Sequence, residues 1–155
     1  MSRRIFISYQ HDDQMKAKGF HLLRWNKNVE LDVVGRHLLD PVDSTNESYI
    51  AEKIREQIRG TSVTVVLIGE NTADSDWIAQ EIQWSLEKDQ PNGILGIKLT
   101  PGARIPDSLT ACGAEIVDWN PPEFEAAIER AAAAQHRVAV LATTPGGMSG
   151  CIRGA

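Results

Sequence analysis

Cysteine is scarce in this sequence: Cys112 and Cys151 are the two that it contains, and they form no CxxC pair. The chain therefore has neither the framework of a small disulfide-stapled domain nor the ligand spacing of a zinc site. The four histidines show no ligand spacing either, so we expect no metal site. So few cysteines suit a reducing compartment, and we expect a cytoplasmic protein.

Long apolar runs are also missing. After the basic pair Arg3-Arg4, the short segment Ile5–Ile7 is all that precedes polar residues. A signal peptide needs a longer apolar stretch, and no segment approaches the roughly 20 residues of a membrane span. We expect no signal peptide and no membrane partner.

An excess of positive charge is absent as well. Lysine and arginine number 16 against 21 acidic residues, for a net charge of −5. Binding to a nucleic-acid backbone requires a clustered basic face, whereas the basic residues here are scattered along the sequence, so we expect no nucleic-acid partner. No glycine-rich loop follows the first predicted strand, which argues against a Rossmann-type grip on a dinucleotide.

What the sequence does contain is an alternation of predicted strands and helices. Strands are predicted at 4–9, 29–34, 63–68, 93–99 and 114–119, from short apolar and β-branched runs. Helices are predicted at about 13–27, from the capping box of Ser44 and Glu47 to Gly60, at 74–88, and after Pro121-Pro122. The segments 35–46 and 100–113 are expected to be loops.

This alternation predicts an α/β protein with right-handed crossovers and helices on both faces of a parallel sheet. At this length we expect a flavodoxin-like three-layer fold with a five-stranded parallel sheet of order 2-1-3-4-5. Residues 1–136 are expected to form one domain. The segment 137–155 is rich in glycine, alanine and threonine, and we expect it to be a flexible C-terminal tail.

The sheet order predicts where a ligand binds. In open α/β sheets the site lies beyond the carboxyl ends of the strands where the order reverses, here between the first and third strands. Ser8, Tyr9 and Asp12 leave the first of these. On the helix after the third strand, Glu81 shares a face with Trp77 four residues earlier and a second indole three residues later. Partial desolvation there would raise the carboxyl's pKa and strengthen its attraction for a cation. The alternative is a solvated Glu81 beside tryptophans that only pack.

Two segments resemble boxes of the TIR domain family. The run Arg4–Tyr9 resembles the first TIR box, an apolar strand ending in Ser-Tyr. The run Ser75–Ile82 resembles the segment that carries the catalytic glutamate of NAD-consuming TIR domains, in which a tryptophan stands four residues before the glutamate. The likeness extends over about residues 4–134 and is closer to short bacterial members, such as the stand-alone TIR subunit of Thoeris anti-phage defence.

The resemblance implies an enzyme that consumes NAD+ as substrate and needs no further cofactor. It implies cleavage of the nicotinamide–ribose bond to give an ADP-ribose-derived signal, with Glu81 as the catalytic residue. The residues assigned to substrate binding are Ser8, Tyr9, Asp12, Asp43, Ser44 and Trp77. The implied partners are other TIR domains, through self-association, and a phage-derived trigger.

Three other functions fit parts of the pattern. A phosphorelay receiver domain shares the fold, but the third strand is followed by Gly69-Glu70-Asn71 where a receiver has its phosphorylated aspartate. A nucleoside deoxyribosyltransferase-like enzyme also places a carboxylate beside ribose. The third alternative is a non-catalytic TIR module that signals by self-association, with Glu81 at the surface.

Overall fold

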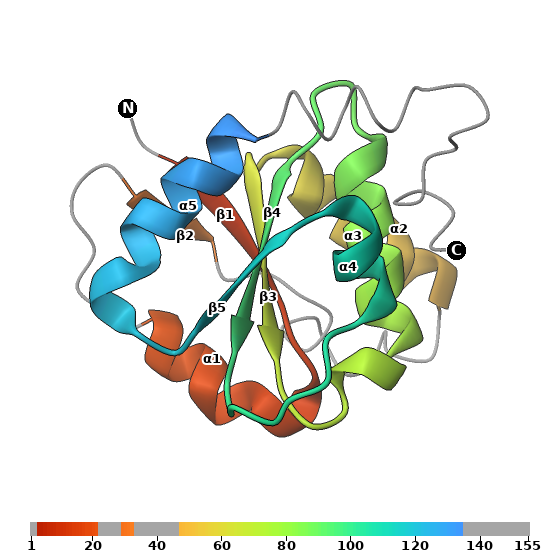
Figure 1. Ribbon diagram of the computed structural model, residues 1–155. Helices are drawn as coiled ribbons and strands as arrows, with labels where there is room; N and C mark the ends of the chain where they lie inside the picture. Colours follow the sequence, from red (N-terminus) through yellow and green to blue (C-terminus); the bar gives the residue numbers. More distant parts are fainter. Residues whose placement is uncertain (1–2, 22–28, 33–46, 135–155) are drawn as a thin grey trace.

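A parallel β-sheet forms the centre of the computed structural model, which describes residues 3–21, 29–32 and 47–134 (Figure 1). Its strands are β1 (Arg3–Ser8), β2 (Val29–Asp32), β3 (Val63–Ile68), β4 (Gly93–Lys98) and β5 (Glu115–Asp118). They lie in the order β2-β1-β3-β4-β5, and every neighbouring pair is parallel. The predicted α/β class, a parallel sheet flanked by helices, is confirmed.

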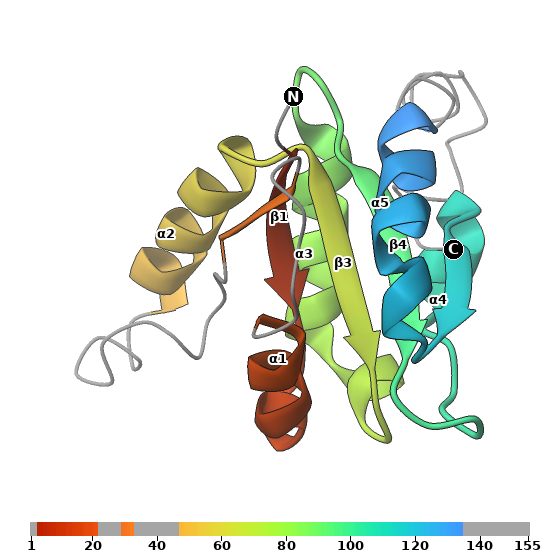
Figure 2. The same ribbon diagram turned by 90° about the vertical axis from the view of Figure 1, so that its left-hand side faces the viewer.

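The helices cover both faces of this sheet, as Figures 1 and 2 show. They are α1 (Gln14–His21), α2 (Glu47–Arg59), α3 (Asp76–Glu87), α4 (Asp107–Cys112) and α5 (Phe124–Ala133). Short 3₁₀ turns precede three of them: η1 (His11–Asp13), η4 (Thr72–Asp74) and η5 (Pro121–Glu123).

Along the strands, odd-numbered and even-numbered residues point to opposite faces of the sheet. On one face, odd-numbered residues such as Ile5 and Val65 pack against α1 and α5, with Phe20 and Phe124 at the centre of that layer. On the other face, Phe6 packs against α2, and Val66 and Ile68 pack against α3 and α4. This is the pattern of a sheet buried on both sides, where side chains point alternately to opposite faces. The all-buried strand β3 is the clearest case.

The start of β4 lies against the backbone of α5. A Cβ atom added at Gly93 would overlap the carbonyl group of Ala131. Only glycine allows so close an approach of helix backbone to strand, because it has no side chain to keep them apart. Gly93 thereby fixes how closely α5 packs on the sheet.

The expected loop between the last two strands contains a helix, so this part of the sequence prediction was wrong. Helix α4 has six residues, follows Pro106 and ends at Gly113, whose φ of +72° is the left-handed conformation common at helix ends. Its buried anchors are Leu109 and Cys112. So short a helix shows too little periodicity to be recognised in sequence. The expected tail at 137–155 and the loop at 35–46 lie outside the described residues.

Candidate functional site

Helix α3 carries Glu81 and is anchored at both its start and its inner face. Ser75 caps the helix, since its side-chain oxygen accepts a hydrogen bond of 3.2 Å from the Ile78 backbone N–H. Ile78 and Ile82 are each 1% exposed and pack into the sheet. The helical repeat then turns Glu81 inward as well, and its side chain is 3% exposed. The alternative of a solvated Glu81 is therefore wrong for this structure.

The inward-facing carboxylate meets the end of β1. The Ser8 hydroxyl donates a hydrogen bond of 2.6 Å to Oε1 of Glu81. Ser8 ends β1, pairs with Val66 in β3 and is 1% exposed, so this contact lies at the carboxyl edge of the two central strands. A short hydroxyl–carboxylate bond of this kind is roughly twice as strong as one between neutral groups. The predicted proximity of Ser8 and Glu81 is found, and Ser8 acts on the carboxylate.

Tyr9 lies on the other side of the strand end. Its side chain is 6% exposed and belongs to the layer beneath α1 and α5. Burial is the main cause that raises the pKa of the Tyr9 hydroxyl, and the negative charge of Glu81 adds to it. The phenol therefore stays protonated at neutral pH close enough to Glu81 to feel its charge. Ser8 and Tyr9 are consecutive residues at the end of β1, and their side chains point to opposite faces of the sheet. Both nevertheless interact with the Glu81 carboxylate.

A chain of buried polar side chains fixes α3 behind Glu81. The Ser85 hydroxyl donates 2.8 Å to the backbone carbonyl of Glu81. Thr64 Oγ1 lies 2.6 Å from Ser85 Oγ, and the Asn92 amide donates 3.0 Å to the same threonine. Since the Ser85 proton goes to the carbonyl, the Thr64 proton goes to Ser85. The exposed fraction of Thr64, Ser85 and Asn92 is 0%. Sequence analysis missed this chain, although Thr64 is the one polar residue within β3 and was the available signal.

The loops after β1 and β3 contact each other at the edge of the site. Asp12 is exposed, and its carboxylate accepts a hydrogen bond of 2.7 Å from the Asn71 side-chain amide. Asp13 lies against Gly69, where any Cβ would overlap the carboxylate. Burial, followed by the charges of Asp12 and Glu70, raises the pKa of Asp13, and its buried Oδ2 has no hydrogen-bond partner. The loops at the predicted ligand position between β1 and β3 thus carry acidic and amide groups.

The remaining predicted residues are Trp77, Asp43 and Ser44. Trp77 is partly buried beside Phe6 in the core between α2 and the sheet, and its ring meets Trp84 edge-on, with centroids 6.3 Å apart. Asp43 and Ser44 lie outside the described residues. Among the described residues, no cluster of three or more His, Cys, Asp or Glu side chains could hold a metal ion. The described helices include none long and apolar enough to cross a membrane.

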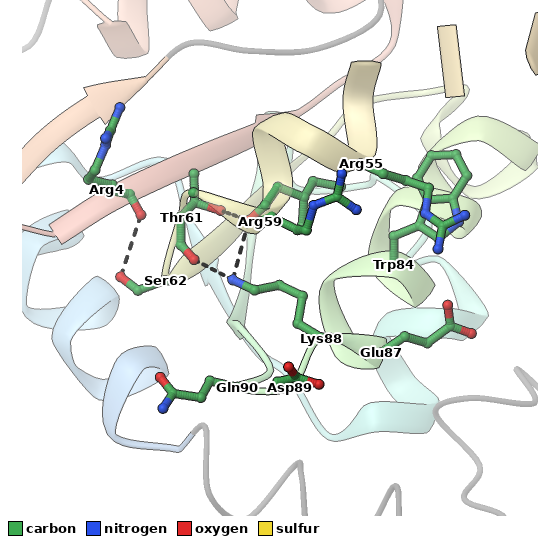
Figure 3. Close-up of a pocket in the computed structure, with 12 residues that line it drawn as sticks. Arg4, Arg55, Arg59, Thr61, Ser62, Trp84, Glu87, Lys88, Asp89 and Gln90 are labelled. Carbon is green, nitrogen blue, oxygen red and sulfur yellow. Dashed lines mark hydrogen bonds between the residues drawn. The ribbon is translucent and has the colours of Figure 1, made fainter. Parts of the chain in front are cut away.

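A pocket of about 730 Å³ lies at the opposite, amino-terminal end of the strands (Figure 3). It is lined by the start of β1, the end of α2, the turn before β3 and the end of α3. Neither Ser8 nor Glu81 contributes to it. The described residues therefore include two separate polar regions, one around the Glu81 carboxylate and the other at the far end of α3.

Comparison with known proteins identifies relatives of the chain. The family model of the Thoeris protein ThsB, TIR-like domain, matches residues 6–103. A curated protein from Bacillus cereus (strain MSX-D12), named "Putative cyclic ADP-D-ribose synthase ThsB1", is 29% identical over 104 residues. That match covers 64% of this chain and 53% of the relative, so the chain spans about half of the relative's length.

The chain also shows a weak similarity to solved structures. The TIR domains of the activated Roq1 resistosome, which directly recognises the pathogen effector XopQ, align over 98% of this chain and 96% of that chain. Their TM-score is 0.40 and their identity 17%. The flavoenzyme NAD(P)H:(acceptor) oxidoreductase FerB from Paracoccus denitrificans covers 64% of this chain and 62% of that chain, with a TM-score of 0.37 and 13% identity. Scores this low carry no argument about function.

Proposed function

The chain belongs to the ThsB TIR-like domain family, and from this premise we propose that it cleaves the nicotinamide–ribose bond of NAD+. The product would be an ADP-ribose-derived signal in anti-phage defence. The observation that carries the proposal is the buried carboxylate of Glu81, held by the Ser8 hydroxyl at the carboxyl edge of β1 and β3. In open parallel sheets, this edge is where ligands bind.

The chemistry matches a single fixed carboxylate. Nicotinamide leaves NAD+ as a neutral molecule, taking the electron pair of the glycosidic bond, so no strong general acid is needed. Positive charge then builds up on the ribose, as in glycoside hydrolysis. A preorganised carboxylate stabilises that charge without having to reorient during the reaction. Attack by water, which loses a proton, gives ADP-ribose, whereas attack by a nitrogen or hydroxyl within the same molecule gives a cyclic ADP-ribose that lacks the elements of that water.

The proposal assigns roles to the residues of the candidate site. Glu81 stabilises the ribosyl cation and Ser8 orients Glu81. Tyr9 supplies a protonated hydroxyl near the carboxylate, and Asp12 stands at the rim among the substrate-binding residues. Trp77, Asp43 and Ser44 remain predicted substrate contacts from the family resemblance alone.

A cyclic product, self-association through TIR–TIR contacts and a phage-derived trigger complete the proposal. The Bacillus cereus relative is named for cyclic ADP-ribose synthesis. Because this chain spans about half of that protein, the product has to be measured for this chain itself.

A second function, a non-catalytic TIR module that signals by self-association, is favoured by one observation. Glu81 is not at the surface, as this alternative expected, but is 3% exposed and already bonded to Ser8, as a purely structural carboxylate would be. In that case Glu81 would stabilise the fold and no NAD+ would be consumed.

The test is to incubate the purified protein with NAD+, with and without a crowding agent that promotes assembly, and to separate the products by chromatography. The variant is Glu81→Gln. The matched control is Glu56→Gln, which changes an exposed helix carboxylate paired only loosely with Lys53 at 3.8 Å. We expect nicotinamide from the wild type and the control, and at least about a hundredfold less from Glu81→Gln, as for the loss of one electrostatic contact to a transition state.

Equal activity of Glu81→Gln would remove Glu81 from the mechanism. Absence of turnover in all three proteins, also in lysate from phage-infected cells, would leave the self-association function. The second product peak identifies the signal as linear or cyclic.

A further inference from the structure

We propose that the pocket at the amino-terminal end of the strands is a binding site for a small molecule that carries a phosphate or diphosphate group. It lies away from Glu81, and the inference does not depend on NAD+ cleavage. Its volume of about 730 Å³ lies within the range of roughly 300–1,000 Å³ typical of small-molecule sites.

The charge of the pocket carries the first step. Four cationic side chains line it against two carboxylates, although the whole chain has a net charge of −5. The cations are Arg4, Arg55, Arg59 and Lys88, and the carboxylates are Glu87 and Asp89. The fold thus gathers cations that are scattered in the sequence. A local excess of positive charge in an acidic protein attracts anionic ligands.

The arginines have the geometry to bind phosphate. The guanidinium of Arg55 lies over the indole of Trp84, with Cζ 5.6 Å from the ring centroid. A stacked guanidinium keeps its N–H groups in its own plane, where they can meet phosphate oxygens in pairs. Arg59 is linked to Glu52 by a contact of 3.6 Å in which both side chains are more than half exposed. Such a pair contributes little, so Arg59 can turn to an anion at small cost.

Lys88 places a positive charge in the pocket, while its ammonium group already donates three hydrogen bonds to oxygens of the protein. Its ammonium donates to the Ile58 and Thr61 carbonyls and to Oδ1 of Asn92. Burial lowers the pKa of this amine, since few solvent molecules stabilise its charge. An anion above it would supply that stabilisation without displacing any of the three bonds.

The far side of the pocket has a different chemistry. In Figure 3, the three arginines lie above Lys88, while Asp89 and Gln90 lie below it. Carboxylate and amide oxygens accept hydrogen bonds from hydroxyl groups. A ligand with phosphate at one end and hydroxyl groups at the other, such as a nucleotide, satisfies both sides.

The probes are ADP, inorganic pyrophosphate and adenosine, titrated into the full chain by calorimetry, with the site located by changes in backbone amide NMR signals. We expect ADP and pyrophosphate to bind and adenosine not to bind. The amide signals that shift should be those of Gly60–Ser62 and Lys88–Gln90. Arg55→Ala and Arg59→Ala should each weaken binding by about tenfold or more, as when a charge-assisted hydrogen bond is lost.

The matched control is Lys53→Ala, which removes an exposed cation of the same helix that does not line the pocket. Binding to Lys53→Ala should equal that of the wild type. If ADP binds more tightly than pyrophosphate, the pocket is a nucleotide site. If the two bind equally tightly, it is a site for free diphosphate. The proposal is overturned if neither probe binds, if the shifts cluster at Ser8–Asp13, or if Lys53→Ala weakens binding as much as Arg55→Ala.

Discussion

Ser8 and Glu81, 73 positions apart in the sequence, are joined by a hydrogen bond of 2.6 Å in which the serine hydroxyl donates to the carboxylate. Both side chains are buried. The contact ties the end of β1 to the middle of α3, and it makes Ser8 a positioning residue for Glu81.

Replacing Ser8 by alanine tests that role. We expect Ser8→Ala to lower kcat for nicotinamide release by about ten- to a hundredfold, since a hydrogen bond to a charged group contributes roughly 1.5–3 kcal/mol, and to leave KM nearly unchanged. Ser8→Thr keeps the hydroxyl and should recover part of the rate. A raised KM with unchanged kcat would instead mean that Ser8 contacts the substrate directly, as expected from the sequence.

The buried polar chain behind Glu81 predicts a loss of stability. Thr64→Val removes the hydroxyl that bonds both Ser85 and Asn92. At roughly 1 kcal/mol for each lost bond, we expect the free energy of unfolding to fall by about 2 kcal/mol in urea denaturation. Thr64→Ser retains the hydroxyl and is the control. Equal stability of the valine and serine variants would show that the chain contributes nothing.

Asp13 predicts a pH dependence. The pKa of Asp13 is raised above its ordinary value of 3.8, so the folded state holds this proton more tightly than the unfolded state does. Its contribution to stability is therefore full below pH 3.8 and is lost as the pH rises through the folded-state pKa. At pH 7 the ionised group is a net cost, and Asp13→Asn should raise the free energy of unfolding by less than about 1 kcal/mol, because the side chain is only partly buried and solvent screens its charge.

This gain should shrink below pH 4, where the wild-type carboxyl is protonated as well. Denaturant unfolding at pH 7 and pH 3.5 measures both values. Asp89→Asn changes an exposed carboxylate and should alter stability little at either pH. A gain for Asp13→Asn that stayed constant with pH would contradict the assignment.

Gly93 predicts a packing defect. In Gly93→Ala the new methyl group overlaps the Ala131 carbonyl, so α5 has to move away from β4. We expect a loss of about 3 kcal/mol, at the upper end for overpacking, measured by thermal or denaturant unfolding. Gly102→Ala is the control, because a Cβ at Gly102 meets nothing within 4 Å. Similar stability of both variants would mean that α5 does not need this close approach.

Strong local patterns were enough to predict much of the fold. The largely apolar run Val63–Ile68 was predicted with its observed bounds, and the helix predicted at 74–88 corresponds to α3. Helix α4 was missed because six residues between Pro106 and Gly113 show little periodicity. Local pattern is informative where an element is long, and it fails where tertiary packing decides.

The candidate site was predicted less completely. The approach of Ser8 to Glu81 followed from the topology, because the strand order alone brings the ends of β1 and β3 together. The direction of the Ser8 bond and the packing of Trp77 into the core depend on side-chain rotations that no sequence pattern records. The pocket at the amino-terminal end of the strands is lined by residues that lie between Arg4 and Gln90 in the sequence. Because its arginines are scattered along the sequence, no local pattern predicted it.

The hydrogen-bonded column of Thr64, Ser85 and Asn92 also decides which way α3 can dock. An apolar helix face can slide along an apolar sheet with little penalty, so hydrophobic contact alone leaves neighbouring alignments close in energy. If α3 slid by one turn, the Thr64 and Ser85 hydroxyls would no longer meet, and each buried group left without its partner would cost about 1–3 kcal/mol. These three polar residues therefore select one alignment of α3 over its competitors, and a design that replaced them with aliphatic residues would gain apolar contact at the expense of a unique docked state.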